Sequence, residues 1–231
     1  MTNLFSPVIS LAAYSSLLSS DMMIRAIINS LFVGTLVVAG NILFCFMTAY
    51  TLARHRFLVN KALFGSAIVI LMIPTHISII PLYVLLVKAH MYDTIWALVL
   101  PWLVTPIGIF LLKQYIESIP TSMEEAARID GASEFRILFS VVMPMCRPAL
   151  AVLAIQTFFT NWNSFLFPFI LTSSDNLRTL PVALALLQGH QAIDWQRLMA
   201  GSAIAVVPVL IVFLILQRQI ISGITAGAIK Q

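Results

Sequence analysis

The sequence predicts an all-α, polytopic membrane protein, and three observations lead to this fold class. Of the 231 residues, 60% are hydrophobic and only 10% are charged, whereas soluble domains carry about 25% charged residues. Five long windows contain no charged residue, and each is long enough for the roughly 20 residues that an α-helix needs to cross a bilayer. Because the windows are continuously apolar and do not alternate, they predict helices and not barrel strands.

The five charge-free windows define the predicted spans in order. They are Ala26–Ala53, Ala62–Val87, Thr94–Leu112, Pro148–Ser174 and Leu198–Gln217. Prolines interrupt the second span at Pro74 and Pro81 and the third span at Pro101 and Pro106. Because a proline frees carbonyl groups and kinks a membrane helix, we expect both of these spans to be bent.

The lysine and arginine residues indicate which side of the membrane each connection faces. With the first basic group placed in the cytoplasm, alternation through five spans assigns nine of the 13 basic residues to the inside and four to the outside. The inner set is Arg54, Arg56, Lys61, Lys113, Arg128, Arg136, Arg147, Arg218 and Lys230, and the outer set is Arg25, Lys88, Arg178 and Arg197. Cytoplasmic connections are rich in basic residues. The sequence therefore predicts a cytoplasmic C-terminus, an extracytoplasmic segment over residues 1–25 and one transmembrane domain over residues 26–231.

A long loop joins the third and fourth spans and carries the pattern of a helical hairpin. Ser122 and Glu125 have the spacing of a capping box at a helix start, and Gly131 offers the left-handed stop that often ends a helix. Ser133 predicts the start of a second helix, which Pro144 is expected to close. The first helix has fewer than three turns and is too short to be stable in isolation, so we expect it to pack against another structure.

The charged residues of this cytoplasmic loop, residues 113–147, admit two interpretations. Glu124 and Arg128 are four residues apart, and such a pair commonly lies on a solvated helix face. Alternatively, the small face formed by Ala126 and Ala127 lets another backbone approach closely, and the surrounding charges pair across an interface.

The order of residues in the loop resembles the EAA motif of ABC-importer permease subunits. That motif reads Glu-Ala-Ala, three residues, Gly, nine residues and an apolar stretch that ends in Pro. Glu125-Ala126-Ala127, Gly131 and Val141-Val142-Met143-Pro144 match it, with valine and methionine in place of isoleucine and leucine. The stretches FFTNWNSFLFP and SGITAGAIK are similar to the carbohydrate-uptake class of these permeases, in particular to the maltose-type second permease.

The resemblance covers essentially the whole chain and implies an assembly. It implies a core of six helices, of which the first is expected to be missing from this sequence. It also implies that the first loop helix is a coupling helix in a cleft of a cytoplasmic ATPase, through Glu125, Ala126, Ala127, Asp130, Gly131 and Pro144. The implied partners are a second permease, two ATPase subunits that bind ATP and Mg²⁺, an extracytoplasmic solute-binding protein and the lipid bilayer of a bacterial or archaeal inner membrane. The tail Ser222–Lys230 is expected to insert between the two ATPase subunits.

The sequence lacks the residues that several other functions need. It contains no Gly-x-x-x-x-Gly-Lys-Ser/Thr pattern, so it is not expected to bind ATP itself. Its four histidines have no metal-ligand spacing, and no cofactor, nucleic acid or catalytic residue is expected. The spans hold no charged residue, which argues against an ion-coupled secondary carrier and against an intramembrane aspartyl protease. The chain is therefore expected to be a transport subunit and not an enzyme.

Polar residues inside the spans are candidates for the solute path. Gln156, Thr160 and Asn163 share one face of the fourth span at positions i, i+4 and i+7, and Asn161 lies beside them. Amide groups interleaved with aromatic rings suit hydroxyl-rich solutes, so this face predicts a path for a sugar or oligosaccharide. Hydrogen bonding between helices is the alternative role for these residues. His76 of the second span is a further candidate, and a polyol or glycerol phosphate is the alternative solute.

Overall fold

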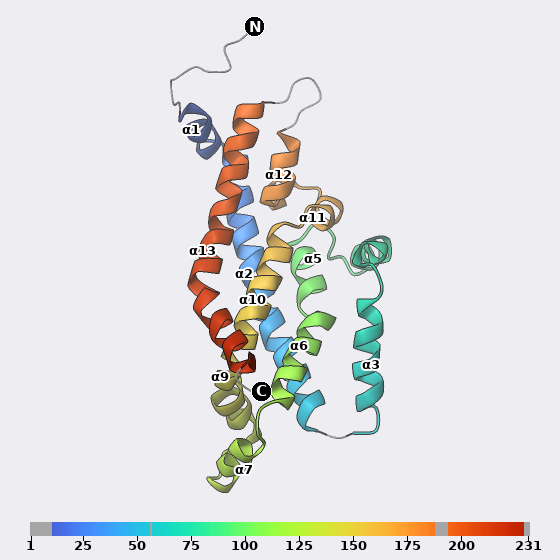
Figure 1. Ribbon diagram of the computed structural model, residues 1–231. Coiled ribbons are helices and arrows are strands. Elements are labelled where there is room, and N and C mark those ends of the chain that lie inside the picture. The colour runs from blue at the N-terminus through green and yellow to red at the C-terminus, as the bar shows by residue number, and fades with distance from the viewer. Residues whose placement is uncertain (1–10, 56, 188–193, 229–231) are drawn as a thin grey trace.

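The computed structural model describes residues 11–55, 57–187 and 194–228, with side chains as far as residue 217. Every regular element in these ranges is a helix, so the all-α prediction is confirmed. The helices form one elongated bundle (Figure 1). By length and composition, two helices can cross a membrane alone, and three bent helix pairs meet the same test together, which gives up to five spans.

The helix α2 (Asp21–Arg54) runs the whole length of the bundle. Its 34 residues span about 51 Å at 1.5 Å per residue, which exceeds the ~30 Å of the hydrocarbon layer. The helices α6 (Pro106–Glu117) and α10 (Arg147–Trp162) pack against it. Cys45 and Phe46 of α2 are fully buried in the core that these helices share, so α2 holds the other spans together.

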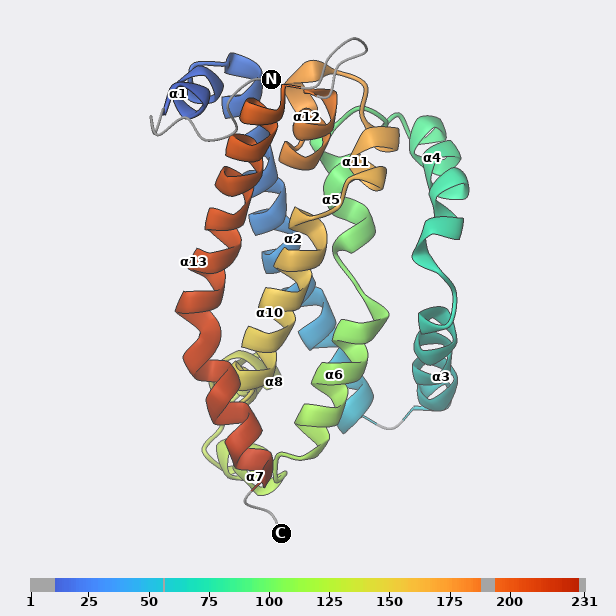
Figure 2. The same ribbon diagram turned by 45° about the horizontal axis from the view of Figure 1, so that its top comes forward.

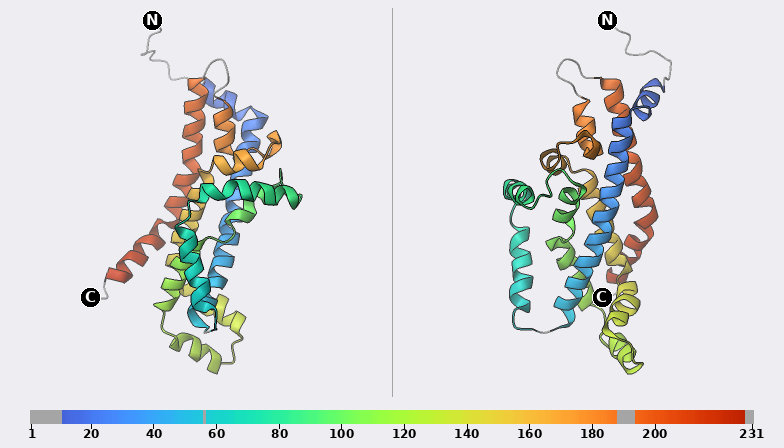
Figure 3. Two further views of the ribbon diagram at one scale, coloured as in Figure 1. Left: turned by 90° about the vertical axis from the view of Figure 1, so that its right-hand side faces the viewer. Right: turned by 180° about the vertical axis from the view of Figure 1, so that it is seen from behind.

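The second predicted span is a pair of helices bent by 98°. The helix α3 (Asn60–Leu71) packs on α6, and after a break the turn η1 (Thr75–Ser78) leads into α4 (Ile79–Lys88). Pro74 lies at the break. It explains the interruption, because proline lacks a backbone donor and keeps the preceding residue out of the helical conformation. The predicted bend is confirmed and is sharp, since α4 lies across the bundle and not along it (Figure 3, left).

The third predicted span also has two segments, which meet at an angle of 41°. The helix α5 (Ile95–Val99) and the turn η2 (Leu100–Trp102) are followed by α6, for which Thr105 is the capping residue. The buried side chain of Asn41 on α2 donates a hydrogen bond to the Trp102 carbonyl at 2.8 Å. A polar side chain inside the bundle therefore satisfies a backbone group at the break, as membrane helices require.

The fourth predicted span ends earlier than the sequence indicated. The helix α10 stops at Trp162, and a separate short helix follows, α11 (Leu166–Leu171). The Asn163 side chain donates to the Phe159 carbonyl at 2.8 Å, and such local bonds compete with the backbone ladder of a helix. The prediction of a continuous helix to Ser174 is therefore wrong.

The fifth predicted span is the first part of a longer helix, α13 (Trp195–Ala228). Because the helix continues beyond Gln217, the segment expected to be a tail is helical as far as Ala228. Its last residue, Lys230, lies outside the described residues. The indole N–H of Trp162 on α10 donates to the Ala205 carbonyl of α13 at 2.9 Å, which fixes these two helices side by side.

The connections gather at the two ends of the bundle (Figure 2). The helix α1 (Ala12–Leu18) packs against α13 and α2 at one end. The helix α4, the turn η4 (Asp175–Leu177) and the helix α12 (Leu180–Leu186) lie at this same end. The final turns of α2 and α6 lie at the opposite end, next to the loop helices, and the last turns of α13 point away from these helices (Figure 3, left). The fold thus separates the connections predicted to be outer from those predicted to be inner.

Candidate functional site

The helical hairpin predicted in the long loop lies at one tip of the bundle (Figure 1). Its first helix is α7 (Ser122–Ile129). Gly131 follows with a φ of +79°. The Gly131 N–H donates to the Arg128 carbonyl, and the next N–H donates to the Ala127 carbonyl, both at 3.0 Å. These two bonds are the Schellman arrangement, which uses a left-handed residue after the helix, so the predicted glycine stop is confirmed.

The start of α7 differs from the predicted capping box. The capping position is Thr121 and not Ser122, and no side chain there bonds to the first turn. The Thr121 carbonyl accepts hydrogen bonds from the N–H groups of Glu124 and Glu125 at 2.9 and 3.0 Å. Ser122 therefore lies within the helix, where its side chain is not in the position of a cap.

The second half of the hairpin is one continuous helical run with three parts. They are α8 (Glu134–Arg136), the π-helical turn η3 (Ile137–Val142) and α9 (Met143–Met145). Ser133 accepts from the N–H of the third residue after it at 3.4 Å, so its predicted role as the cap is confirmed. Pro144 lies inside the run and does not close it. The chain instead turns by 79° into α10 one residue later.

The predicted coupling residues of the loop are almost all on its surface. Glu125, Ala126, Asp130, Gly131 and Pro144 are exposed, and Ala127 is half-buried against the core. The neighbouring Glu124 faces the opposite way, with only 2% of its surface exposed. Two adjacent glutamates of one short helix are thus divided between solvent and the protein interior.

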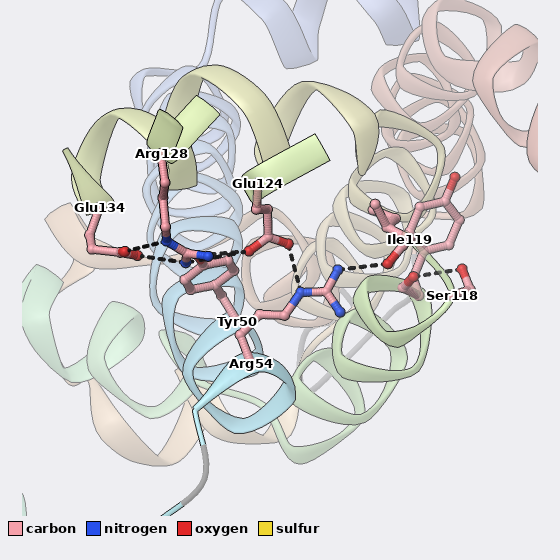
Figure 4. Close-up of polar contacts among 8 residues, drawn as sticks. Tyr50, Arg54, Ser118, Ile119, Glu124, Arg128 and Glu134 are labelled. Carbon is pink, nitrogen blue, oxygen red and sulfur yellow. Dashed lines mark hydrogen bonds and ion pairs between the residues drawn. The ribbon is translucent and has the colours of Figure 1, made fainter. Parts of the chain in front are cut away.

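Glu124 anchors α7 on α2 (Figure 4). Its Oε1 accepts a hydrogen bond from Arg54 Nε at 2.6 Å, and its Oε2 accepts one from the Tyr50 hydroxyl at 3.1 Å. Arg54 Nη2 also donates to the Ile119 carbonyl at 2.8 Å. A buried charge is tolerated when it is paired and hydrogen-bonded, and these contacts meet both conditions. One guanidinium therefore holds both α7 and the segment that leads into it.

Arg128 has two carboxylate partners within the chain. Its guanidinium lies 4.0 Å from the Glu124 carboxylate, but its close partner is Glu134 on α8, at 2.9 Å. The hydrogen bond from Arg128 lowers the pKa of Glu134 below its ordinary value. The pair of Glu124 with Arg128 is therefore present only as a long contact, and the shorter ion pairs join α7 to α2 and to α8.

Tyr50 and Arg54 were not among the residues predicted for this site. They lie 74 and 70 positions before Glu124 in the sequence, and Arg54 was assigned only as a basic residue at the inner membrane surface. The sequence does contain one signal that a glutamate of this helix faces inward. Neighbouring residues of a helix point about 100° apart. The Glu124–Glu125 pair therefore already indicates that the two carboxylates face different surroundings.

Three large apolar side chains of the hairpin are exposed. Met123 is 50% exposed, Phe135 71% and Ile129 87%. Large apolar side chains that gather on a surface mark sites of interaction. The tip of the bundle therefore combines exposed apolar groups with the charges of Glu125 and Asp130.

The candidate solute residues of α10 lie on one face that the described helices leave largely uncovered. Gln156, Thr160 and Asn163 are exposed, and Asn161 is half-buried. The adjacent Thr157 faces inward instead and donates to the Asn41 side chain of α2 at 3.3 Å. Hydrogen bonding between helices thus accounts for Thr157, whereas the predicted polar face points away from α2.

His76 lies apart from this face. It is exposed in the turn η1, and its ring centroid is 6.2 Å from that of Phe167 on α11. An open pocket of about 340 Å³ lies close by, with Thr75, Ser78 and Trp102 among its lining residues. The structure thus groups His76 with α11 and not with the polar face of α10.

A second polar cluster holds the opposite end of the bundle. Asp93, which has a φ of +56° in the turn between α4 and α5, accepts hydrogen bonds from the N–H groups of Ser173 and Ser174 at 2.8 and 3.0 Å. The Ser174 hydroxyl donates to the same carboxylate. Burial raises the pKa of Asp93, but these hydrogen bonds outweigh burial and lower the pKa to about 2. The ionised carboxylate thus fastens the α4–α5 turn to the connection after α11.

A bundle of apolar helices with up to five candidate spans defines a multi-pass membrane protein. Residues 40–225 match the family described as the binding-protein-dependent transport system inner membrane component. The chain belongs to this family and is a multi-pass permease subunit of an ABC importer. It is a transport component and not an enzyme.

Individual relatives agree with this assignment. The chain is 37% identical over 202 residues to the arabinooligosaccharides transport system permease protein AraQ of Halalkalibacterium halodurans, which covers 87% of this chain and 72% of that protein. It is 31% identical over 221 residues to the trehalose transport system permease protein SugB of Mycobacterium tuberculosis, covering 94% and 81%. In fold it is similar to a chain of a bacterial ABC transporter involved in the import of the acidic polysaccharide alginate, with a TM-score of 0.80, 24% identity and coverage of 91% and 79%.

Proposed function

We propose that this chain is one of two permeases of an importer for a sugar or oligosaccharide, and that α7 is its contact with an ATPase. The named relatives transport arabinooligosaccharides and trehalose, and another, from Bacillus subtilis, is a melibiose/raffinose/stachyose import permease that is 34% identical. Relatives with such different sugars support the solute class and not one particular sugar. The remaining partners are a second permease, two ATPase subunits that bind ATP and Mg²⁺, and an extracytoplasmic solute-binding protein.

The proposed ATPase contact rests on the residues that the hairpin exposes. Glu125, Ala126 and Asp130 are exposed together with Ile129 and Phe135, while Glu124 of the same helix is bonded to α2. A short helix that is held on one side and exposes both apolar and charged side chains on the other fits the helix-in-groove mode of recognition. The small Ala126 side chain lets the partner approach the helix backbone.

The proposed orientation follows from the basic residues at the hairpin end. The connections at this end carry Arg54, Lys61, Arg128 and Arg136, and cytoplasmic connections are enriched in basic residues. We therefore place α7 and the last turns of α13 in the cytoplasm of a bacterial or archaeal cell, and α1, α4 and α12 outside. The exposed polar face of α10 is then proposed to line the path toward the second permease, with Gln156 and Thr160 in contact with solute hydroxyls.

Capture of the ATPase tests the proposal directly. The chain is expressed with its second permease and ATPase, and co-purification is compared for the unaltered protein, Ala126→Arg and Ser19→Arg. Ala126 is exposed on α7, and Ser19 is exposed at the opposite end of the bundle, so the two variants add the same side chain at different places. We expect the Ala126→Arg protein to insert into the membrane but not to capture the ATPase. The long, charged arginine side chain would keep the ATPase from approaching the backbone of α7.

Ser19→Arg is expected to retain the ATPase. Equal capture by both variants, with normal membrane insertion, would show that α7 is not the contact. Solute uptake into vesicles that contain the complete complex, with arabinooligosaccharides, trehalose and glycerol phosphate as separate probes, then tests the solute class. Uptake of glycerol phosphate alone would contradict the proposed sugar.

A further inference from the structure

The charge cluster behind α7 has a role that docking of the ATPase does not explain. Docking uses the exposed face of α7, whereas Glu124 points into the protein and is 2% exposed. Its carboxylate contacts Arg54 and Tyr50 of α2, and Arg54 also holds the Ile119 carbonyl. We name these four residues, Tyr50, Arg54, Ile119 and Glu124, the α2–α7 joint.

The α2–α7 joint is built to resist relative movement of the two helices. Arg54 has only 10% of its side chain exposed, so its ion pair with Glu124 lies in a region of low effective dielectric. Electrostatic attraction is stronger there than in water, and separating the two groups would leave each charge buried without a partner. The planar guanidinium also fixes direction, because its Nε and Nη2 bind different segments at the same time.

The helix α2 continues from the α2–α7 joint to the opposite end of the bundle, where it contacts the outer connection before α12. There Asn29 donates to the Asn176 carbonyl at 2.8 Å. The Ser30 hydroxyl accepts from the Leu180 N–H at 2.7 Å. Because α2 is one uninterrupted helix of 34 residues, a displacement at its inner end reaches these contacts without passing through a loop.

We propose that the α2–α7 joint passes displacement of α7 to α2, and that Glu124 is its positioning residue. The bent spans α3–α4 and α5–α6 are each interrupted by a break, whereas α2 is continuous. The α2–α7 joint therefore connects an ATPase-facing helix to the outer connection by one rigid element. This inference rests on the proposed function, because it needs an ATPase that moves α7.

Distance measurements in the complete transporter test this role. Nitroxide labels are attached at Ser122→Cys on α7 and Asp21→Cys at the outer start of α2, both exposed positions. The native Cys45 and Cys146 are buried and protected from the label. Pulsed electron–electron double resonance measures the distance between the two labels. The complex without nucleotide is compared with the complex that holds Mg-ATP and vanadate.

With the α2–α7 joint intact, we expect a narrow distance distribution that is the same in both nucleotide states. In Glu124→Gln the ATPase is still captured, but the distribution broadens and shifts when Mg-ATP and vanadate are added, because α7 then moves without α2. Tyr50→Phe removes one hydrogen bond while it keeps the ion pair, and it is expected to give a smaller change of the same kind. It serves as the test variant if Glu124→Gln does not assemble.

Glu125→Gln is the matched control on the neighbouring, outward position. It is expected to weaken ATPase capture and to leave the distribution without nucleotide as narrow as in the unaltered protein. A role of Glu124 in stability alone would lower the thermal unfolding midpoint but leave the distance independent of nucleotide, and this result would overturn the proposal. A distance that changes with nucleotide in the unaltered protein would also overturn the proposed role of the α2–α7 joint. Failure of the unaltered chain to capture the ATPase would instead contradict the proposed function.

Discussion

At the scale of single residues, position on a helix decides which of two identical side chains is structural. Glu124 and Glu125 have the same chemistry, yet one is buried in an ion pair and the other is exposed. Their difference arises because the Glu124 side of α7 faces Tyr50 and Arg54 of α2, and adjacent residues point about 100° apart. The same substitution at the two positions therefore tests two different functions.

Loss of Arg54 is expected to destabilise the fold strongly. Arg54→Ala leaves the Glu124 carboxylate buried without its cation, and removing one partner of a buried pair costs about 3–5 kcal/mol. The matched control is Arg197→Ala, whose pair with Asp194 is half exposed at 49% and 50% and is worth about 0–1 kcal/mol. Unfolding of the purified chain in mixed micelles measures both values, and equal losses would contradict the buried pair.

Alanine substitutions at two glycines are expected to have opposite signs. Both glycines have open space where a β-carbon would lie, but only Gly131 has a positive φ, of +79°. Gly131→Ala should destabilise the protein by about 1–2 kcal/mol, the cost of a left-handed conformation for a residue with a β-carbon. Gly65→Ala lies within α3 and should stabilise it by up to about 1 kcal/mol. The two unfolding free energies are measured in the same micelles, and the prediction fails if they change in the same direction.

At the scale of elements, polar side chains hold places where the helical backbone is interrupted. Asn41 of α2 bonds to the Trp102 carbonyl between α5 and α6, and to Thr157 of α10. Asp93 likewise fastens the α4–α5 turn to the connection after α11. Each polar residue thus stabilises a bend where the backbone ladder is interrupted.

The Asp93 cluster is expected to lose its stabilising effect only in strong acid. Hydrogen bonds place the folded-state pKa of Asp93 at about 2, below the ordinary value of 3.8. The ionised form therefore favours the folded state. Its contribution is fully present above pH 3.8 and is lost as the pH falls through about 2.

Hydrogen exchange at the Ser173 and Ser174 amides measures this contribution. After correction for the intrinsic rate, protection should be constant from pH 6 to about pH 4 and should fall as the pH approaches 2. In Asp93→Asn, protection should be low at every pH and should not vary with it. A loss of protection between pH 6 and 5 in the unaltered chain would contradict the assignment.

At the scale of the whole molecule, the bundle has two chemically different ends. One carries α7, the second loop helices and most basic residues of the connections, and the other carries α1, α4 and α12 (Figures 2 and 3). The long α2 and α13 reach from one end to the other. A permease needs this polarity, because its energy source and its solute arrive from opposite sides of the membrane.

Labelling from one side of the membrane tests the proposed orientation. A membrane-impermeant maleimide added to intact cells should react with Ser19→Cys and not with Ser122→Cys, since these exposed residues lie at opposite ends. In inside-out vesicles the pattern should reverse. Lysis of the cells provides the control that both cysteines are reactive, and reaction of Ser122→Cys in intact cells would show the opposite orientation.

The sequence by itself determined the fold class, the number of apolar segments and the position of the loop hairpin. Composition and charge-free windows are local properties, because each span must satisfy its own backbone in lipid. The glycine stop at Gly131 and the cap at Ser133 were also predictable, since they depend on conformational preferences of single residues.

The tertiary structure alone decided the shape of the spans and the partners of the charges. The 98° turn before α4, the early end of α10 and the helical path of α13 beyond Gln217 do not follow from local hydropathy, because the apolar windows continue through the first two and stop before the third. The ion pair of Arg54 with Glu124 joins residues 70 positions apart. Such contacts form only when the chain brings distant segments together, and for this reason the buried anchor of α7 was absent from the predicted site while its exposed face was not.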